Sequence, residues 1–249
     1  SRKIKVLEMD QIYYTKNIEY SVKRGKRRKT VAIAINPEAQ VIVRVPIFLS
    51  QDRIESIVGK KYRWILEKQR YFRQLATLYP KKEFVSGEQL LLFGRRYRLK
   101  VQEEREQKIE APSLEGRRIS VCYNKNLAPD KRRQEIEHCL TKWYFAMAKD
   151  IVRDRIQRYS QFIGVKPKEI KIKDQEKRWG SCSSNGVLRF NWRIAMSPVS
   201  IIDYIVVHEL CHLKVKSHSA DFWKQVGMVL PDYQRRREWL RNNSAMVRI

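Results

Sequence analysis

The chain has 249 residues, of which 43% are hydrophobic and 10% aromatic, a composition that allows one large globular domain or two smaller ones. Its 53 Lys and Arg against 27 Asp and Glu give a net charge of +26, which favours anionic partners, nucleic acid first among them. The four cysteines include no C-x-x-C pair, which argues against a disulfide framework. No apolar run reaches the ~18 residues of a membrane span, and we expect a cytoplasmic protein with no membrane partner. Composition does not indicate the oligomeric state.

The N-terminal part predicts an antiparallel β meander over residues 11–46, with strands at 18–22, 30–35 and 40–46. A run of basic residues, 23–29, lies between the first two of these strands, at the expected tip of a hairpin. Lys26, Arg27, Arg28 and Lys29 are therefore candidate contacts to the phosphates of DNA or RNA. The alternative is a charged hairpin end that serves only solubility.

An amphipathic helix is expected at about 51–77, and β structure returns over 84–123 as two hairpins. The first hairpin turns at Gly94, and the second pairs residues near 108–109 with 119–121. Because the β-rich part ends near 124–129, we predict two domains. They are residues 1–126, β-rich and antiparallel with one long helix, and residues 127–249.

The second half begins with the longest helical pattern, from about Pro129 to Phe162, ended by Gly164. Strands follow at 169–173 and, from about 178–183, on either side of an Asn185-Gly186 pair that indicates a type I′ turn into 187–192. Ser197-Pro198 has the pattern of a helix start.

The helix that follows carries the motif His208-Glu209-Leu210-Cys211-His212. Two imidazoles at i and i+4 stand one turn apart on a helix, close enough to bind one metal ion. Glu209 lies beside the open position of such a metal, where a carboxylate can take a proton from bound water. With three of the four histidines inside 208–218, the sequence predicts one Zn²⁺ per chain rather than buried structural histidines.

A catalytic zinc ion takes three protein ligands and keeps one position for water, so a third ligand is required. His218 follows His212 after a five-residue spacer that is long enough to leave the helix and return. Asp221 and Glu238 are the rival candidates, as later carboxylates. We favour His218.

Several motifs together resemble the YgjP-like metallopeptidase family, which is related to the SprT-like and Wss-type zinc proteases. They are Arg178-Trp179-Gly180-Ser181-Cys182-Ser183, Asn191-Trp192-Arg193, the stretch 208–218, Phe222-Trp223 and Leu230-Pro231-Asp232-Tyr233. The resemblance implies an α+β, zincin-like fold with a cleft rimmed by an edge strand near Trp179–Cys182. It also implies His208, His212 and His218 as zinc ligands and Glu209 as the catalytic base, with Cys211 only packing the helix.

These features predict an intracellular zinc-dependent metallopeptidase acting on peptides or proteins, with DNA or RNA as a candidate further partner. Trp179, Gly180 and Ser181 are candidate substrate-binding residues on an unpaired strand edge, although Trp179 could equally be a hydrophobic cover. Tyr233 is a candidate donor to the oxyanion. The alternative is a nucleic-acid-binding protein with a structural or vestigial zinc site, but structural sites are usually closed by four ligands.

Overall fold

The computed structural model describes residues 12–78, 80–104, 111–175 and 178–243. The chain divides into two compact units, Ser1–Lys81 (unit 1) and Lys82–Ile249 (unit 2), each with its own hydrophobic core. The sequence predicts a boundary near residue 126. The β-rich stretch 84–123 instead shares a core with the long helix that follows it, and this packing assigns the stretch to unit 2. None of the described helices combines the length and apolarity that a membrane span requires.

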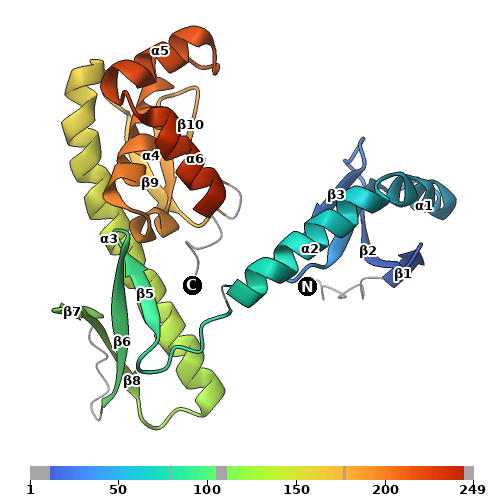
Figure 1. Cartoon of the computed structure of the whole chain (residues 1–249), viewed down its shortest axis with the longest axis horizontal. Helices are drawn as coiled ribbons and strands as arrows, with labels where there is room; N and C mark the ends of the chain where they lie inside the picture. Colours follow the sequence, from blue (N-terminus) through green and yellow to red (C-terminus); the bar gives the residue numbers. More distant parts are fainter. Residues whose placement is uncertain (1–11, 79, 105–110, 176–177, 244–249) are drawn as a thin grey trace, which may run out of the picture. The chain divides into compact units, whose positions relative to one another are not determined.

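Unit 1 is a four-stranded sheet covered on one face by two helices (Figure 1). Its elements are β1 (Ile12–Thr15), β2 (Ile18–Gly25), β3 (Ala32–Ile35), β4 (Val41–Pro46), α1 (Gln51–Lys60) and α2 (Tyr62–Leu78). The expected single helix is interrupted at Lys61, where the backbone leaves α geometry. Ile54, Val58 and Ile65 are fully buried against the sheet, as the predicted amphipathic pattern requires of one helix face.

The meander predicted for unit 1 is wrong in its pairing. The strand order is β1-β2-β4-β3, so β4 lies between β2 and β3 and runs parallel to β2. The basic segment therefore connects strands on opposite sides of β4 and is not a hairpin tip. Burial explains the central place of β4. Its side chains Val41, Val43 and Val45 are fully buried in the core, and a strand on each side of β4 is needed to bury them completely.

Unit 2 begins with a second four-stranded sheet of the same topology, in the order β5-β6-β8-β7 with β6 and β8 parallel. Its strands are β5 (Gln89–Leu92), β6 (Arg95–Glu104), β7 (Ser113–Glu115) and β8 (Arg118–Asn124). The hairpin at Gly94 is confirmed, with Phe93 and Gly94 both at positive φ, as a type I′ turn requires. The strand expected near Lys108–Ile109 lies outside the described residues, and the β7–β8 turn is centred on Gly116 and Arg117.

The remaining elements of unit 2 pack around one long helix, α3 (Figure 1). They are α3 (Pro129–Ile163), β9 (Glu169–Lys173), β10 (Gly180–Cys182), β11 (Val187–Asn191), the 3₁₀ helix η1 (Trp192–Met196), α4 (Val199–Cys211), α5 (Ala220–Val229) and α6 (Tyr233–Asn243). The predicted α3 is confirmed, including its end at Gly164 in the left-handed region. The sheet order β10-β11-β9 leaves β10 on an edge.

The turn between β10 and β11 differs from the predicted type I′ turn. Asn185 does not have a positive φ, whereas Gly186 does, and the Gly186 N–H donates to Ser183 O at 3.1 Å. The Ser183 side chain also accepts from Val187 N. The hydrogen bond between the Ser183 hydroxyl and the backbone of Val187 favours a four-residue turn that ends at Gly186, in the left-handed region.

The β5–β6 hairpin is fixed through its turn to η1 and to the start of α4. Phe93 N donates to Ala195 O at 2.7 Å, and Gly94 N donates to Met196 O at 3.2 Å. A Cβ on Gly94 would lie 2.7 Å from the Cα of Pro198, at the start of α4. The backbone of this turn therefore reaches α4 only because position 94 has no side chain.

Gly94→Ala should destabilise unit 2 by about 2–4 kcal/mol, because it adds a clash with rigid backbone to the strain of a left-handed alanine. The free energy of unfolding from urea denaturation measures this. Gly116→Ala is the matched control, since Gly116 has φ +59 with nothing within 4 Å of its Cβ position. The control should cost only about 1 kcal/mol. Equal losses in the two variants would contradict the docking argument.

Candidate metal centre

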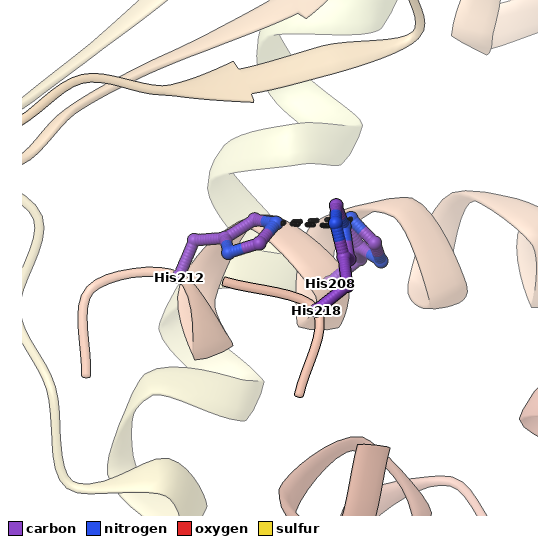
Figure 2. Close-up of side chains that lie close together, drawn as sticks. All are labelled: His208, His212 and His218. Atoms are coloured by element: carbon purple, nitrogen blue, oxygen red, sulfur yellow. Dashed lines mark hydrogen bonds between the residues drawn. The ribbon is translucent and has the colours of Figure 1, made fainter. Parts of the chain in front are cut away.

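Three imidazole rings converge at the end of α4, and their Nε2 atoms form a small triangle (Figure 2). The separations are 3.2 Å between His208 and His212, 3.2 Å between His212 and His218, and 3.1 Å between His218 and His208. His208 lies in the last turn of α4 and His212 is its C-cap, while His218 returns from the loop before α5. Among the described residues, this is the one group of metal-capable side chains.

The triangle has the dimensions of a metal site. A tetrahedral zinc ion with Zn–N distances of about 2.0–2.1 Å separates its nitrogen ligands by about 3.3 Å. The Nδ1–H of His212 donates to Val215 O at 3.0 Å. The neutral ring therefore carries its proton on Nδ1, and the lone pair of its Nε2 points into the triangle. The residues present therefore fit a metal ion held by three nitrogens.

Burial keeps two of the imidazoles, those of His208 and His212, uncharged near neutral pH. It lowers the pKa of His208 to about 3, and the neighbouring His212 and His218 act in the same direction. Burial is also the largest cause of the lowered pKa of His212. A metal ion binds the neutral imidazole, so the rings of His208 and His212 need not lose a proton before they bind a metal ion.

Phe222 in α5 forms the floor on which all three rings pack. Its ring centroid lies 4.9 Å from His208, 4.4 Å from His212 and 4.9 Å from His218. Phe222 is fully buried, and its backbone N–H is capped by the side chain of Ser219 at 3.4 Å. The start of α5 thus fixes the Phe222 ring, and this ring limits the directions in which the imidazoles can turn.

Glu209 lies next to the triangle in the motif and is only 5% exposed. Burial raises the pKa of its carboxyl to about 8, and the positive charge of Arg178 opposes this shift. Its Oε2 has no hydrogen-bond partner among the described residues. A buried carboxylate with one free oxygen is suited to accept a proton from a small molecule beside it.

The edge strand β10 passes directly over this carboxylate. A Cβ built on Gly180 would lie 2.6 Å from the Oε1 of Glu209. Buried Asn191 holds the segment that leads into β10, because its amide donates to Gln175 O at 2.6 Å and to Arg178 O at 3.2 Å. A side chain at position 180 would therefore force the Glu209 carboxylate to move.

The comparison with protein families matches residues 29–243 to the YgjP-like metallopeptidase domain. The chain belongs to the YgjP-like metallopeptidase family. It is accordingly a zinc-dependent metallopeptidase, a hydrolase, and peptides or proteins are its class of substrate.

Two solved structures of archaeal zymogens are similar over part of the chain. The metallopeptidase zymogen abylysin of Pyrococcus abyssi is 25% identical over 35% of this chain and 86% of its own, with a TM-score of 0.32. The zymogen jannalysin of Methanocaldococcus jannaschii is 28% identical over 32% of this chain and 78% of its own, with a TM-score of 0.27. The comparison with curated proteins gave no match.

The other residues singled out in the sequence lie outside the cluster of three histidines. Asp221 and Glu238, the rival ligands, are outside the histidine cluster, and Glu238 pairs with Arg241 at 3.3 Å. Cys211 is fully buried in the core. His138, the one histidine of the chain outside 208–218, is exposed on α3.

Tyr233 and Trp179 both border the core of unit 2. The Tyr233 ring stacks on Trp223 at 5.3 Å, and Trp223 in turn stacks on His218 at 5.6 Å. Trp179 is half-buried at the start of β10 and packs against the core, while its carbonyl accepts from Asn191 N at 2.9 Å. Ser181 is half-buried on the same strand.

Sequence reasoning missed the roles of Phe222, Trp223 and Tyr204. The signal for the first two is the aromatic pair Phe222-Trp223, which begins four residues after His218 and is also one of the motifs of the family. Tyr204 precedes His208 by one turn of α4, with the ring centroids 5.9 Å apart. Burial raises its pKa to about 12, and the charges of Arg237, Tyr233 and Glu209 reach its hydroxyl.

Gly180→Ala should displace the Glu209 carboxylate and lower peptidase activity at least about tenfold, while zinc content stays unchanged. Cleavage of a synthetic peptide mixture, together with metal analysis, measures both. Gly227→Ala is the control, since its Cβ would meet the Tyr233 ring at an ordinary 3.5 Å. Full activity in Gly180→Ala would show that the carboxylate does not need this approach.

Proposed function

We propose that His208, His212 and His218 hold one zinc ion and that Glu209 is the general base of peptide hydrolysis. The triangle of Nε2 atoms, 3.1–3.2 Å on each side, is the observation that carries the proposal. A bound zinc ion supplies Lewis acidity, which acidifies a water molecule and polarises the substrate carbonyl. Family membership supports the reaction class, and the geometry of this chain supports the roles of its residues.

Glu209 takes the proton of the attacking water on its free carboxylate oxygen and delivers it to the leaving amine. Its raised pKa, about 8, brings it close to the range in which one group can both accept and give a proton at neutral pH. The Tyr233 hydroxyl is the donor that we assign to the carbonyl oxygen as it gains negative charge. Phe222 and the Val215 carbonyl keep the imidazoles in place.

The substrate binds in extended form along the free edge of β10. This strand pairs with β11 on one side, and no described strand pairs with its other side. Backbone pairing at Gly180 and Ser181 would hold a peptide beside Glu209, because the same glycine touches that carboxylate. Trp179 borders this edge and covers the core behind it.

Two substitutions separate the ligand role from the base role. His208→Ala should lose the zinc ion, because two imidazoles bind zinc far more weakly than three. Glu209→Gln should keep the zinc ion but lower peptidase activity by about 10²–10⁴, because an amide cannot accept the proton of water. Metal analysis and cleavage of a peptide mixture measure the two effects.

His138→Ala is the control for this pair, since it removes an exposed histidine of α3 that is outside the cluster and should retain both zinc and activity. Stoichiometric zinc in a His208→Ala/His212→Ala double variant would overturn the ligand assignment. Wild-type turnover in Glu209→Gln would instead remove Glu209 from its role and leave the zinc site standing.

A second function, nucleic-acid binding by unit 1, is favoured by a basic and apolar surface at the end of β4. Lys26, Arg27 and Lys29 are exposed there, in the segment that passes from β2 to β3. Arg24 donates to the carbonyls of Ile47 and Leu49, at 3.2 and 2.6 Å, and thereby fixes the turn that carries Phe48. Phe48 is 80% exposed. Cations beside an exposed aromatic ring can contact phosphates while a base stacks on the ring.

Unit 1 also carries a large share of the charge, with 19 Lys and Arg against 7 Asp and Glu in residues 1–81. We propose that this surface recruits the protease to DNA or RNA. If the protein instead only binds nucleic acid and its zinc site is structural or vestigial, Glu209→Gln will change no activity, because there will be none to lose.

Replacing Lys26, Arg27, Arg28 and Lys29 by Ser should flatten the dependence of log affinity on log salt by about 3, at roughly 0.7–0.9 per phosphate contact. Fluorescence anisotropy with single-stranded DNA over a salt series measures the slope. Phe48→Ala should weaken single-stranded more than duplex binding, because only unpaired bases can stack.

The control changes the charge by the same amount on α1, α2 and their junction, by replacing Lys60, Lys61, Arg63 and Arg70 with Gln. All four are exposed. If the control flattens the slope equally, the effect is one of net charge alone. If the wild-type protein fails to bind at low salt, recruitment by this surface is wrong, and the protease assignment is unaffected.

A further inference from the structure

Arg237 is stacked over an aromatic ring that contacts the metal centre. Its guanidinium carbon lies 4.7 Å from the centroid of the Trp223 ring. The same indole stacks on His218 at 5.6 Å, and its centroid is 5.9 Å from His208. Tyr233, one turn earlier in α6, also stacks on Trp223. One indole therefore separates this cation from the proposed zinc ligands.

The charge of Arg237 is not neutralised by the described part of the protein. No described carboxylate lies within ion-pair distance of it, and the side chain is exposed. The neighbouring Arg236 is very different. It pairs with Asp232 at 2.9 Å and Asp203 at 3.9 Å, and it donates to Ser200 O at 2.9 Å. Of these two adjacent arginines, Arg236 joins α6 to α4, and Arg237 is left with its donors available.

Arg237 lies close to the proposed metal centre. The Trp223 indole beneath its guanidinium contacts both His208 and His218, so only one ring lies between the cation and these proposed ligands. Stacking occupies one face of the guanidinium plane. The N–H groups lie along the edge of this plane and stay available as hydrogen-bond donors. Those groups match the two oxygens of a carboxylate.

We propose that Arg237 is a specificity residue that binds a carboxylate of the peptide substrate. The inference rests on the proposed zinc and substrate sites and adds the chemical class that they accept. The carboxylate could be the C-terminus of the peptide or the side chain of Asp or Glu. Trp223 fixes the position of the guanidinium, so that the bond forms at a set distance from the metal centre.

Three small probes distinguish these sources in titrations of the zinc-loaded protein followed by NMR. N-acetyl-Ala-Ala carries a free C-terminal carboxylate, N-acetyl-Ala-Glu-amide carries only a side-chain carboxylate, and N-acetyl-Ala-Ala-amide carries neither. Arg237→Gln should weaken binding of at least one acidic probe about tenfold or more, as expected for loss of a charge-assisted contact. Arg237→Lys should restore part of it, because the charge returns without the planar fork.

Arg235→Gln is the matched control. It removes the same charge from an exposed position two residues earlier on α6 and should change binding less than about twofold. A loss confined to the first probe identifies the C-terminal carboxylate, and a loss confined to the second identifies an acidic side chain. In cleavage of peptides with the matching carboxylate, Arg237→Gln should raise KM and leave kcat nearly unchanged.

Equal affinities in Arg237→Gln and Arg235→Gln would overturn the proposal, as would failure of both acidic probes to bind more tightly than the neutral one. Metal analysis of each sample keeps this result separate from the proposed function. A protein that binds no zinc would contradict the metal centre itself, whereas a zinc-loaded protein indifferent to Arg237 would contradict only the specificity assignment.

Discussion

The burial of α4 on nearly all its sides is the constraint on which the rest of unit 2 depends. Ile202, Val206 and Val207 are fully buried, and α3, α5, α6 and β10 all pack around this helix. Because those neighbours are needed to cover it, they bring Phe222 beneath the imidazoles and Gly180 against Glu209. The need to bury α4 thus positions the polar side chains of the site, which form few hydrogen bonds to one another.

The same burial sets the chemistry of the centre. Removal from water favours the uncharged form of each buried titratable group, so His208 and His212 stay neutral while Glu209 acquires a higher affinity for a proton. Neutral imidazoles and a basic carboxylate are what metal-assisted hydrolysis needs from its protein. Arg178 and Arg237 approach from the solvent side, where their charges act on Glu209 and His208 without displacing the core.

Local patterns predicted the features that depend on neighbours in sequence. The i, i+4 histidines, the end of α3 at Gly164 and the hairpin at Gly94 all fall in this class. Features set by distant segments could not be found in this way, because periodicity shows which face is buried and not what covers it. The insertion of β4 between β2 and β3 is one example, and the floor made by Phe222 is another. The packing of residues 84–123 on α3, a helix that contacts two sheets, is a third example.

The order of the elements along the chain is also the order in which a ribosome releases them. Every residue in the core of unit 1, from Ile18 to Ile65, emerges before the first strand of unit 2, so this unit can complete its packing during synthesis. Unit 2 closes much later, because α4 stays uncovered until α5 and α6 have followed it. The imidazole triangle and its floor therefore form only after all eleven described strands have been made. A nascent chain, whose unpaired strands are the kind of extended peptide a protease binds, has no assembled metal centre with which to cleave itself or its neighbours.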